Sequence, residues 1–229
     1  MRKFRILLLA LGLLAVPLAV TPAMAAVHKA DVTAAAPTAA QILARAGKGC
    51  AKVSKGNYKT DEDAGSAKIS ICKAGKAFVW KADMDIDCDG ISTSHCSKKT
   101  DDAYQNQTSF ETSKGKPFQA DKTHYFVIPL PSSRFSYKNN GIKPGSVAAI
   151  IFKGKVVYAV FADEGPEEII GEASFATATA LGIPNNPNTG GVDSGVTYVV
   201  FPGQVPSPIE DNSKIDAKGI AAATAFINS

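Results

Sequence analysis

The sequence has few histidines and only one long apolar run, and both shortages narrow the possible functions. Its three histidines, His28, His95 and His124, share no spacing found in metal sites or catalytic triads. We therefore expect neither a histidine-based metal centre nor a Ser-His-Asp triad. No metal or other cofactor is predicted. Internal repeats are also lacking, which excludes solenoid and propeller architectures.

The single long apolar run, residues 6–20, lies at the N-terminus. Arg2, Lys3 and Arg5 precede it, and the small residues 23–25 follow it. This order of basic, apolar and small residues is typical of a secretory signal peptide. The run is shorter than a comfortable membrane span. We predict that the chain is secreted and that it has no membrane attachment once the signal peptide is removed.

This pattern also sets the predicted domain organisation. Residues 1–25 form the signal peptide, residues 26–37 an alanine-rich spacer, and residues 38–229 a single domain of ordinary size. We expect the mature protein to be an extracellular monomer.

The chain has little excess charge of either sign. It carries 25 Lys and Arg against 21 Asp and Glu, a formal net charge of +4. Three of the basic residues belong to the predicted signal peptide, so the mature chain is nearly neutral. A nucleic-acid partner therefore has no overall electrostatic support.

Cysteine is scarce but even in number. Cys50, Cys72, Cys88 and Cys96 all lie in the first half of the predicted mature chain. An even count in an exported protein favours two disulfides, and three pairings are possible. Spacing makes Cys50–Cys72 with Cys88–Cys96 the simplest pairing, whereas a zinc site lacks the usual CxxC or histidine spacing.

Hydrophobic periodicity predicts a mainly β protein with short helices. A capping-box pattern at Thr38 opens a helix that should end at Gly47. Residues 78–88 alternate with period two, and a hairpin is expected around Lys153-Gly154. Further strands are expected at 124–130 and 195–201, with helices at 172–181 and 216–227. Many short strands with few helices indicate a β-barrel or sandwich.

The stretch DMDIDCDG places Asp83, Asp85, Asp87 and Asp89 at alternate positions, predicted to share one strand face. Residues 85–90 match the start of a calcium loop, but its twelfth position, which should be a glutamate, is a cysteine. A solvated acidic face is a second interpretation. A third is a row of carboxylates that binds an extended cationic ligand, such as a polymer of amino sugars.

A second acidic group contains Asp163, which is predicted to close a buried strand, and Glu172, which is predicted to begin a helix. Carboxyl groups in such different surroundings can have pKa values that are pushed apart, as paired acid–base catalysis requires. The alternatives are a turn residue for Asp163 and a helix-dipole partner for Glu172.

Four segments together resemble the chitosanases of glycoside hydrolase family 75. They are MDIDCDG, HYFVIP, GSVAAIIFKGKVVYAVFADEGP and IGEASFATATALGI, in this order along the chain. The resemblance implies a secreted, endo-acting enzyme that cleaves β-1,4 bonds in chitosan with inversion. It also implies that Asp163 and Glu172 are the essential carboxylates of a catalytic domain. The aspartate row would then bind glucosamine units, with Asp83, Asp85 and Asp87 as the predicted contacts.

The segment from VFADEGP to ALGI is also similar to double-psi β-barrel proteins. This weaker resemblance implies a six-stranded barrel with an N-terminal disulfide-bonded extension. By analogy with such barrels, Glu172 would be the general acid and Asp163 the base. The main alternative function is an expansin-like or carbohydrate-binding barrel that does not hydrolyse its ligand.

Overall fold

A computed structural model describes residues 35–229. The predicted signal peptide and residues 26–34 of the predicted spacer lie outside the described residues. Within residues 35–229, none of the helices combines the length and the apolar character that crossing a membrane requires.

The described chain is mainly β, as predicted. Its helices are α1 (Ala39–Ala46), α2 (Phe175–Leu181), α3 (Asn212–Ile227) and the short 3-10 helix η1 (Lys138–Asn140). Its strands are β1 (Ala51–Lys52), β2 (Cys72–Ala74), β3 (Ala77–Asp87), β4 (Tyr125–Pro129), β5 (Val147–Phe152), β6 (Lys155–Gly165), β7 (Glu172–Ser174) and β8 (Val192–Val200).

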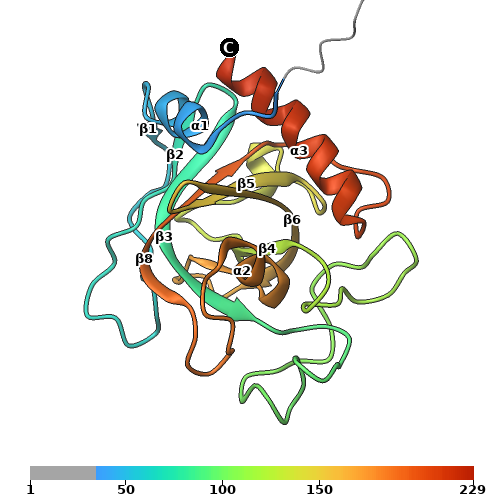
Figure 1. Ribbon diagram of the computed structural model, residues 1–229. Helices are drawn as coiled ribbons and strands as arrows, with labels where there is room; N and C mark the ends of the chain where they lie inside the picture. Colours follow the sequence, from blue (N-terminus) through green and yellow to red (C-terminus); the bar gives the residue numbers. More distant parts are fainter. Residues whose placement is uncertain (1–34) are drawn as a thin grey trace, which may run out of the picture. The chain divides into compact units, whose positions relative to one another are not determined.

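Six of these strands close into a barrel in the order β3-β7-β4-β6-β5-β8, because β8 pairs back onto β3 (Figure 1). The short strands β1 and β2 extend the sheet at β3 and carry the Cys50–Cys72 disulfide. The second disulfide joins Cys88 to Cys96, so the predicted pairing is confirmed. The predicted six-stranded barrel with a disulfide-bonded N-terminal extension is confirmed too, while its double-psi connectivity stays a prediction.

Alternation along the strands separates two apolar regions. The barrel interior receives the even-numbered side chains of β3, from Phe78 to Ile86, together with residues such as Phe126 and Tyr198. The outer face of β5, β6 and β8 packs against α1 and α3. Ile42 of α1 is among the buried residues of this outer cluster. Figure 1 shows both helices on the outside of the barrel. Cys88, predicted to share the interior face, instead packs in the outer cluster, because it lies beyond the end of β3.

Local signals position three of the elements. Thr38 and Gln41 form the predicted capping box at the start of α1. Lys153 and Gly154 make the two-residue turn between β5 and β6, with φ values of 45° and 81°. Positive φ at both turn residues matches the right-handed twist of the paired strands.

Helix α2 begins later than predicted. Residues 172–174 form strand β7, and Ser174 caps the helix by accepting a hydrogen bond from the backbone N–H of Thr177. Pairing with both β3 and β4 holds β7 extended. Glu172 therefore lies on a barrel strand, and its predicted place at a helix N-terminus was wrong.

Candidate active site

The aspartates of β3 lie on the outer face of the barrel, opposite its apolar interior residues. Strand β7 pairs in parallel with this end of β3, with Asp85 opposite Glu172 and Asp87 opposite Ser174. The row is not uniformly solvated, because Asp83 and Asp87 are only 3% and 4% exposed, whereas Asp85 is exposed. The barrel thus brings the predicted aspartate row beside Glu172.

A β-bulge places Asp163 on the same face. Phe126 of β4 pairs with Phe161, but Val127 pairs with Asp163, so Ala162 has no partner on β4. In a regular ladder without the bulge, Asp163 would share the face of Phe161 and point into the barrel. With the bulge, Asp163 pairs with Val127, shares its outward face and lies against the aspartates of β3. Strand β6 also continues beyond Asp163 to Gly165, rather than ending there as predicted.

The two oxygens of Asp163 have different surroundings. Oδ1 accepts hydrogen bonds from the Ser109 backbone N–H (2.9 Å), the Ser109 hydroxyl (2.5 Å) and the Glu164 backbone N–H (2.8 Å). Oδ2 is buried and has no hydrogen-bond partner within residues 35–229. Burial raises the pKa of Asp163, while the hydrogen bonds from Ser109 and Glu164 oppose this by stabilising the ionised form. One carboxylate oxygen of Asp163 is fixed by three hydrogen bonds, and the other is buried and accepts none within residues 35–229.

Glu172 has no such donors. No hydrogen bond to its carboxyl group occurs among the described residues. Burial, followed by the charges of Asp85 and Asp163, raises the pKa of Glu172 to about 8. Glu172 is therefore protonated at mildly acidic and neutral pH, as a general acid must be.

Asp87, Asp89 and Asp163 form a compact group, with one carboxylate oxygen from each lying within 4.8 Å of the others. Asp87 Oδ1 accepts hydrogen bonds from the Asp89 backbone N–H (2.7 Å) and the Tyr125 hydroxyl (3.0 Å). Burial and the nearby carboxylates, Glu172 first, raise the pKa of Asp87 well above its usual range. These contacts hold Asp87 inside the protein, beside Asp163.

The calcium-loop interpretation of residues 85–90 does not fit this geometry. Asp85 and Asp87 lie on an extended strand, and Cys96 is bonded to Cys88. The described acids form two separate groups that could hold a cation, Asp87-Asp89-Asp163 and Asp61-Asp83-Asp85. Neither group is a continuous loop of ligands.

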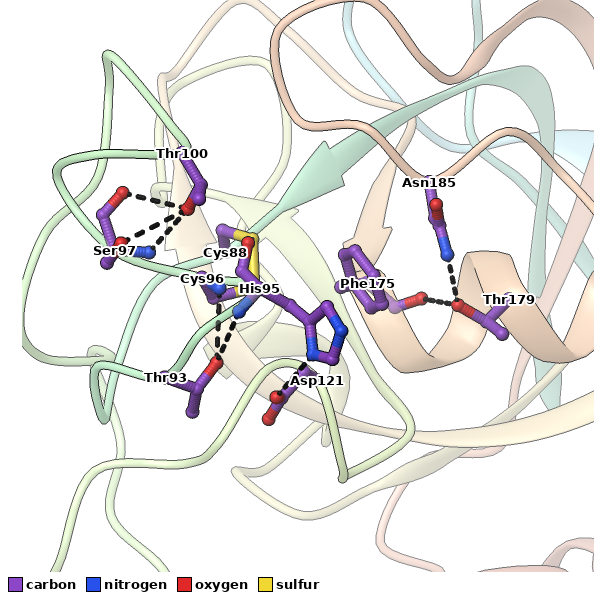
Figure 2. Close-up of polar contacts among 10 residues, drawn as sticks. All are labelled: Cys88, Thr93, His95, Cys96, Ser97, Thr100, Asp121, Phe175, Thr179 and Asn185. Carbon is purple, nitrogen blue, oxygen red and sulfur yellow. Dashed lines mark hydrogen bonds and ion pairs between the residues drawn. A yellow bond between two sulfur atoms is a disulfide. The ribbon is translucent and has the colours of Figure 1, made fainter.

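The loop closed by the Cys88–Cys96 disulfide follows the end of β3 and packs against the start of α2 (Figure 2). His95 Nδ1 lies 3.2 Å from Asp121 Oδ2, and the His95 ring stacks on Phe175 with the ring centroids 5.3 Å apart. Phe175 is the first residue of α2 and follows β7 directly. The disulfide loop therefore helps to fix the strand ends that carry the acidic groups.

A cavity in the described part of the chain lies away from these acids. Its volume is about 520 Å³, and Lys73, Phe78, Phe201, Lys218 and Phe226 are among the residues that line it. No Asp or Glu is among its lining residues. The acidic groups therefore do not line this cavity.

Sequence patterns missed Ser109 and Asp61, both of which lie in loops without hydrophobic periodicity. Tyr125 was expected only as part of a buried strand, yet its hydroxyl also donates to Asp87. Nothing in the local sequence distinguishes these residues, since their partners are distant in the chain.

Comparison with known proteins gives the family. The family described as fungal chitosanase of glycosyl hydrolase group 75 matches residues 84–229, more than half of the chain. The chain belongs to this family. The match spans β3 from Met84 onward and the rest of the barrel, including Asp163 and Glu172.

Two similar proteins are endo-chitosanases of Aspergillus species. The chain is 36% identical to endo-chitosanase C of Aspergillus oryzae over 135 residues, 56% of this chain and 32% of the relative. It is 27% identical to an endo-chitosanase of Aspergillus fumigatus over 166 residues, 67% of this chain and 69% of the relative. The chain thus spans about a third of the length of the Aspergillus oryzae relative that it matches.

Proposed function

We propose that this protein is a secreted, endo-acting glycoside hydrolase that cleaves β-1,4 bonds in chitosan, with residues 38–229 as its single catalytic domain. The single observation that carries the proposal is the contrast between Asp163 and Glu172. One carboxyl group accepts three hydrogen bonds on one oxygen, and the other accepts none and has its pKa raised to about 8. Membership of the chitosanase family supports the substrate class.

The contrast supports Glu172 as the general acid and Asp163 as the general base of an inverting reaction. The Asp163 carboxylate would take a proton from water as the water oxygen bonds to the anomeric carbon. The bond from that carbon to the bridging oxygen would break, and Glu172 would give its proton to that oxygen. An inverting enzyme needs about 6.5–9.5 Å between the two carboxyl groups to admit the water.

The aspartates of β3 support chitosan over neutral polysaccharides. Asp83 and Asp85 lie on the strand face beside Glu172, where protonated amines of glucosamine would balance their charge. Asp87, predicted as a third contact, is held by Tyr125 and the Asp89 N–H, so we propose a supporting role for it. Chitin and cellulose should therefore be poor substrates.

Soluble chitosan, with reducing ends measured at mildly acidic pH, tests the activity. Release of oligosaccharides is expected, and proton NMR of the first products should show the α-anomer. An initial β-anomer would rule out inversion. Binding to chitosan without any release of reducing ends would favour the non-hydrolytic alternative.

A further inference from the structure

Asp61 joins two of the β3 aspartates although it lies far from them in the sequence. One carboxylate oxygen each from Asp61, Asp83 and Asp85 lies within 4.8 Å of the others. Asp61 and Asp85 are exposed, whereas Asp83 is 3% exposed. The group therefore has a buried base and an open side.

Backbone contacts beside Glu172 hold this group together. The Lys59 N–H donates to the Glu168 carbonyl (2.8 Å), and the Ile170 N–H donates to the Lys59 carbonyl (3.1 Å). These bonds fix the turn that carries Asp61 against the segment leading into β7.

Gly171 connects the same segment to β3. The Asp85 N–H donates to the Gly171 carbonyl at 2.7 Å, and Asp85 lies opposite Glu172 in the strand register. Gly171 has φ of +129°, and a Cβ atom there would lie 1.9 Å from Asp83 Oδ1. Only glycine leaves room for the Asp83 side chain at this position.

Within residues 35–229, Asp83 is a buried acid with one oxygen that lacks a hydrogen-bond partner. Its Oδ1 has no hydrogen bond within residues 35–229, and neither ion pair in that part of the chain involves Asp61, Asp83 or Asp85. Burial, with the charges of Asp85 and Asp61 among the further causes, raises the pKa of Asp83 to about 8. A bound cation would favour the ionised forms of these acids and so lower their pKa values.

We propose that Asp61, Asp83 and Asp85 bind the protonated amine of a glucosamine unit next to the cleaved bond, and that Asp61 determines specificity for this unit. The inference rests on the proposed function, which it deepens. An ammonium group has three donors, and N–O contacts of about 2.8 Å place its three acceptors about 4.6 Å apart. The observed spacing suits this group, and N-acetylation would remove the charge and two of the donors.

The test compares Asp61→Asn with Asp63→Asn, an exposed acid on the same turn that lies outside both acidic groups. We expect Asp61→Asn to lower kcat/KM on fully deacetylated chitosan about tenfold, the size of one charged hydrogen bond. The loss should be smaller on partly acetylated chitosan, and Asp63→Asn should match the wild-type chain on both substrates. Equal losses for the two variants would overturn the inference.

A binding measurement separates this inference from the proposed function. Isothermal titration of the Glu172→Gln variant with a glucosamine tetramer needs no turnover. Binding that weakens about tenfold when Asp61→Asn is added supports the subsite, even if the wild-type chain releases no reducing ends. Active wild-type enzyme with binding unchanged by Asp61→Asn would overturn the subsite and leave the proposed function standing.

A divalent ion is the competing occupant of the same three carboxylates. Chelator-treated wild-type chain and Asp61→Asn would be titrated with Ca²⁺ while the melting temperature is followed. A rise in the wild-type chain alone, at micromolar Ca²⁺, would make this a metal site and overturn the assignment to ammonium. No rise in either protein is the expected result.

Discussion

The outer surface of the barrel has an apolar region and an acidic region, and β6 contributes residues to both. Under α1 and α3 the surface is apolar, with residues such as Tyr158 and Val160 of β6 packed beneath the helices. At the far end of β6, past the bulge at Ala162, the outer face carries Asp163 and meets the aspartates of β3.

The two regions therefore have different roles. The helix-covered region stabilises the fold, and the acidic region is the candidate active site. The helix-covered region removes apolar area from water and so stabilises the fold. The acidic region brings together carboxyl groups whose pKa values are raised by burial and by one another, which costs stability in the ionised state. Changes in the first region should therefore affect folding, and changes in the second should affect activity.

The largest expected effect is on turnover in the acidic region. Glu172→Gln would remove the proposed proton donor and Asp163→Asn the proposed base, so each should lower kcat by about 10²-fold or more. Reducing-end assays on soluble chitosan measure this loss. Glu167→Gln, an exposed change in the same turn, is the matched control and should retain full activity. Near-normal turnover in either site variant would move the catalytic role to another residue.

The next effect is on stability in the helix-covered region. Phe226 of α3 is 5% exposed and packs against Phe201, with ring centroids 5.7 Å apart. Phe226→Ala should lower the free energy of unfolding by about 3 kcal/mol, measured by chemical denaturation, while kcat at low temperature stays unchanged. Leu43→Ala, at a side chain 39% exposed, should change stability little. A loss of kcat in folded Phe226→Ala would show that the two regions are coupled.

A smaller effect is expected from Ser109, whose hydroxyl donates to Asp163 Oδ1. Ser109→Ala removes one bond that favours the ionised base, so the pKa of Asp163 should rise by about one unit. The acidic limb of the kcat/KM profile should move to higher pH by the same amount. Ser109→Thr keeps a hydroxyl and should restore the profile. A uniform loss at every pH would indicate a structural role only.

The last expected effect is a change of stability with pH. Burial raises the pKa of Asp83 to about 8, of Asp89 to about 7 and of Glu172 to about 8. Between about pH 5 and pH 8 the folded chain therefore holds protons that the unfolded chain has lost, so stability should fall as pH rises. The slope is about 1.4 kcal/mol per pH unit for each fully buried group, and less for groups that water screens. Asp83→Asn should flatten the curve measured by denaturation, and an unchanged slope would contradict the assigned shift.

Local sequence signals specify several elements of the fold. Period two in residues 78–86 gave β3 its interior and outer faces, because successive strand side chains point to opposite sides. The capping box at Thr38 set the start of α1, and Lys153-Gly154 set the β5–β6 turn. The resemblance to a chitosanase family identified Asp163 and Glu172 as the pair to examine. These features depend on residues close together in the chain or on a family pattern.

Long-range contacts bring those residues together. The bulge at Ala162 turns Asp163 outward, and it exists only in the register between β4 and β6. Residues 172–174 resemble a helix start in sequence, yet pairing with β3 and β4 makes them a strand. Ser109 and Asp61 join the acids of β3 and β6 from loops that have no period of their own. Register, burial and long-range hydrogen bonds arise from contacts between distant segments, and a local pattern does not encode them.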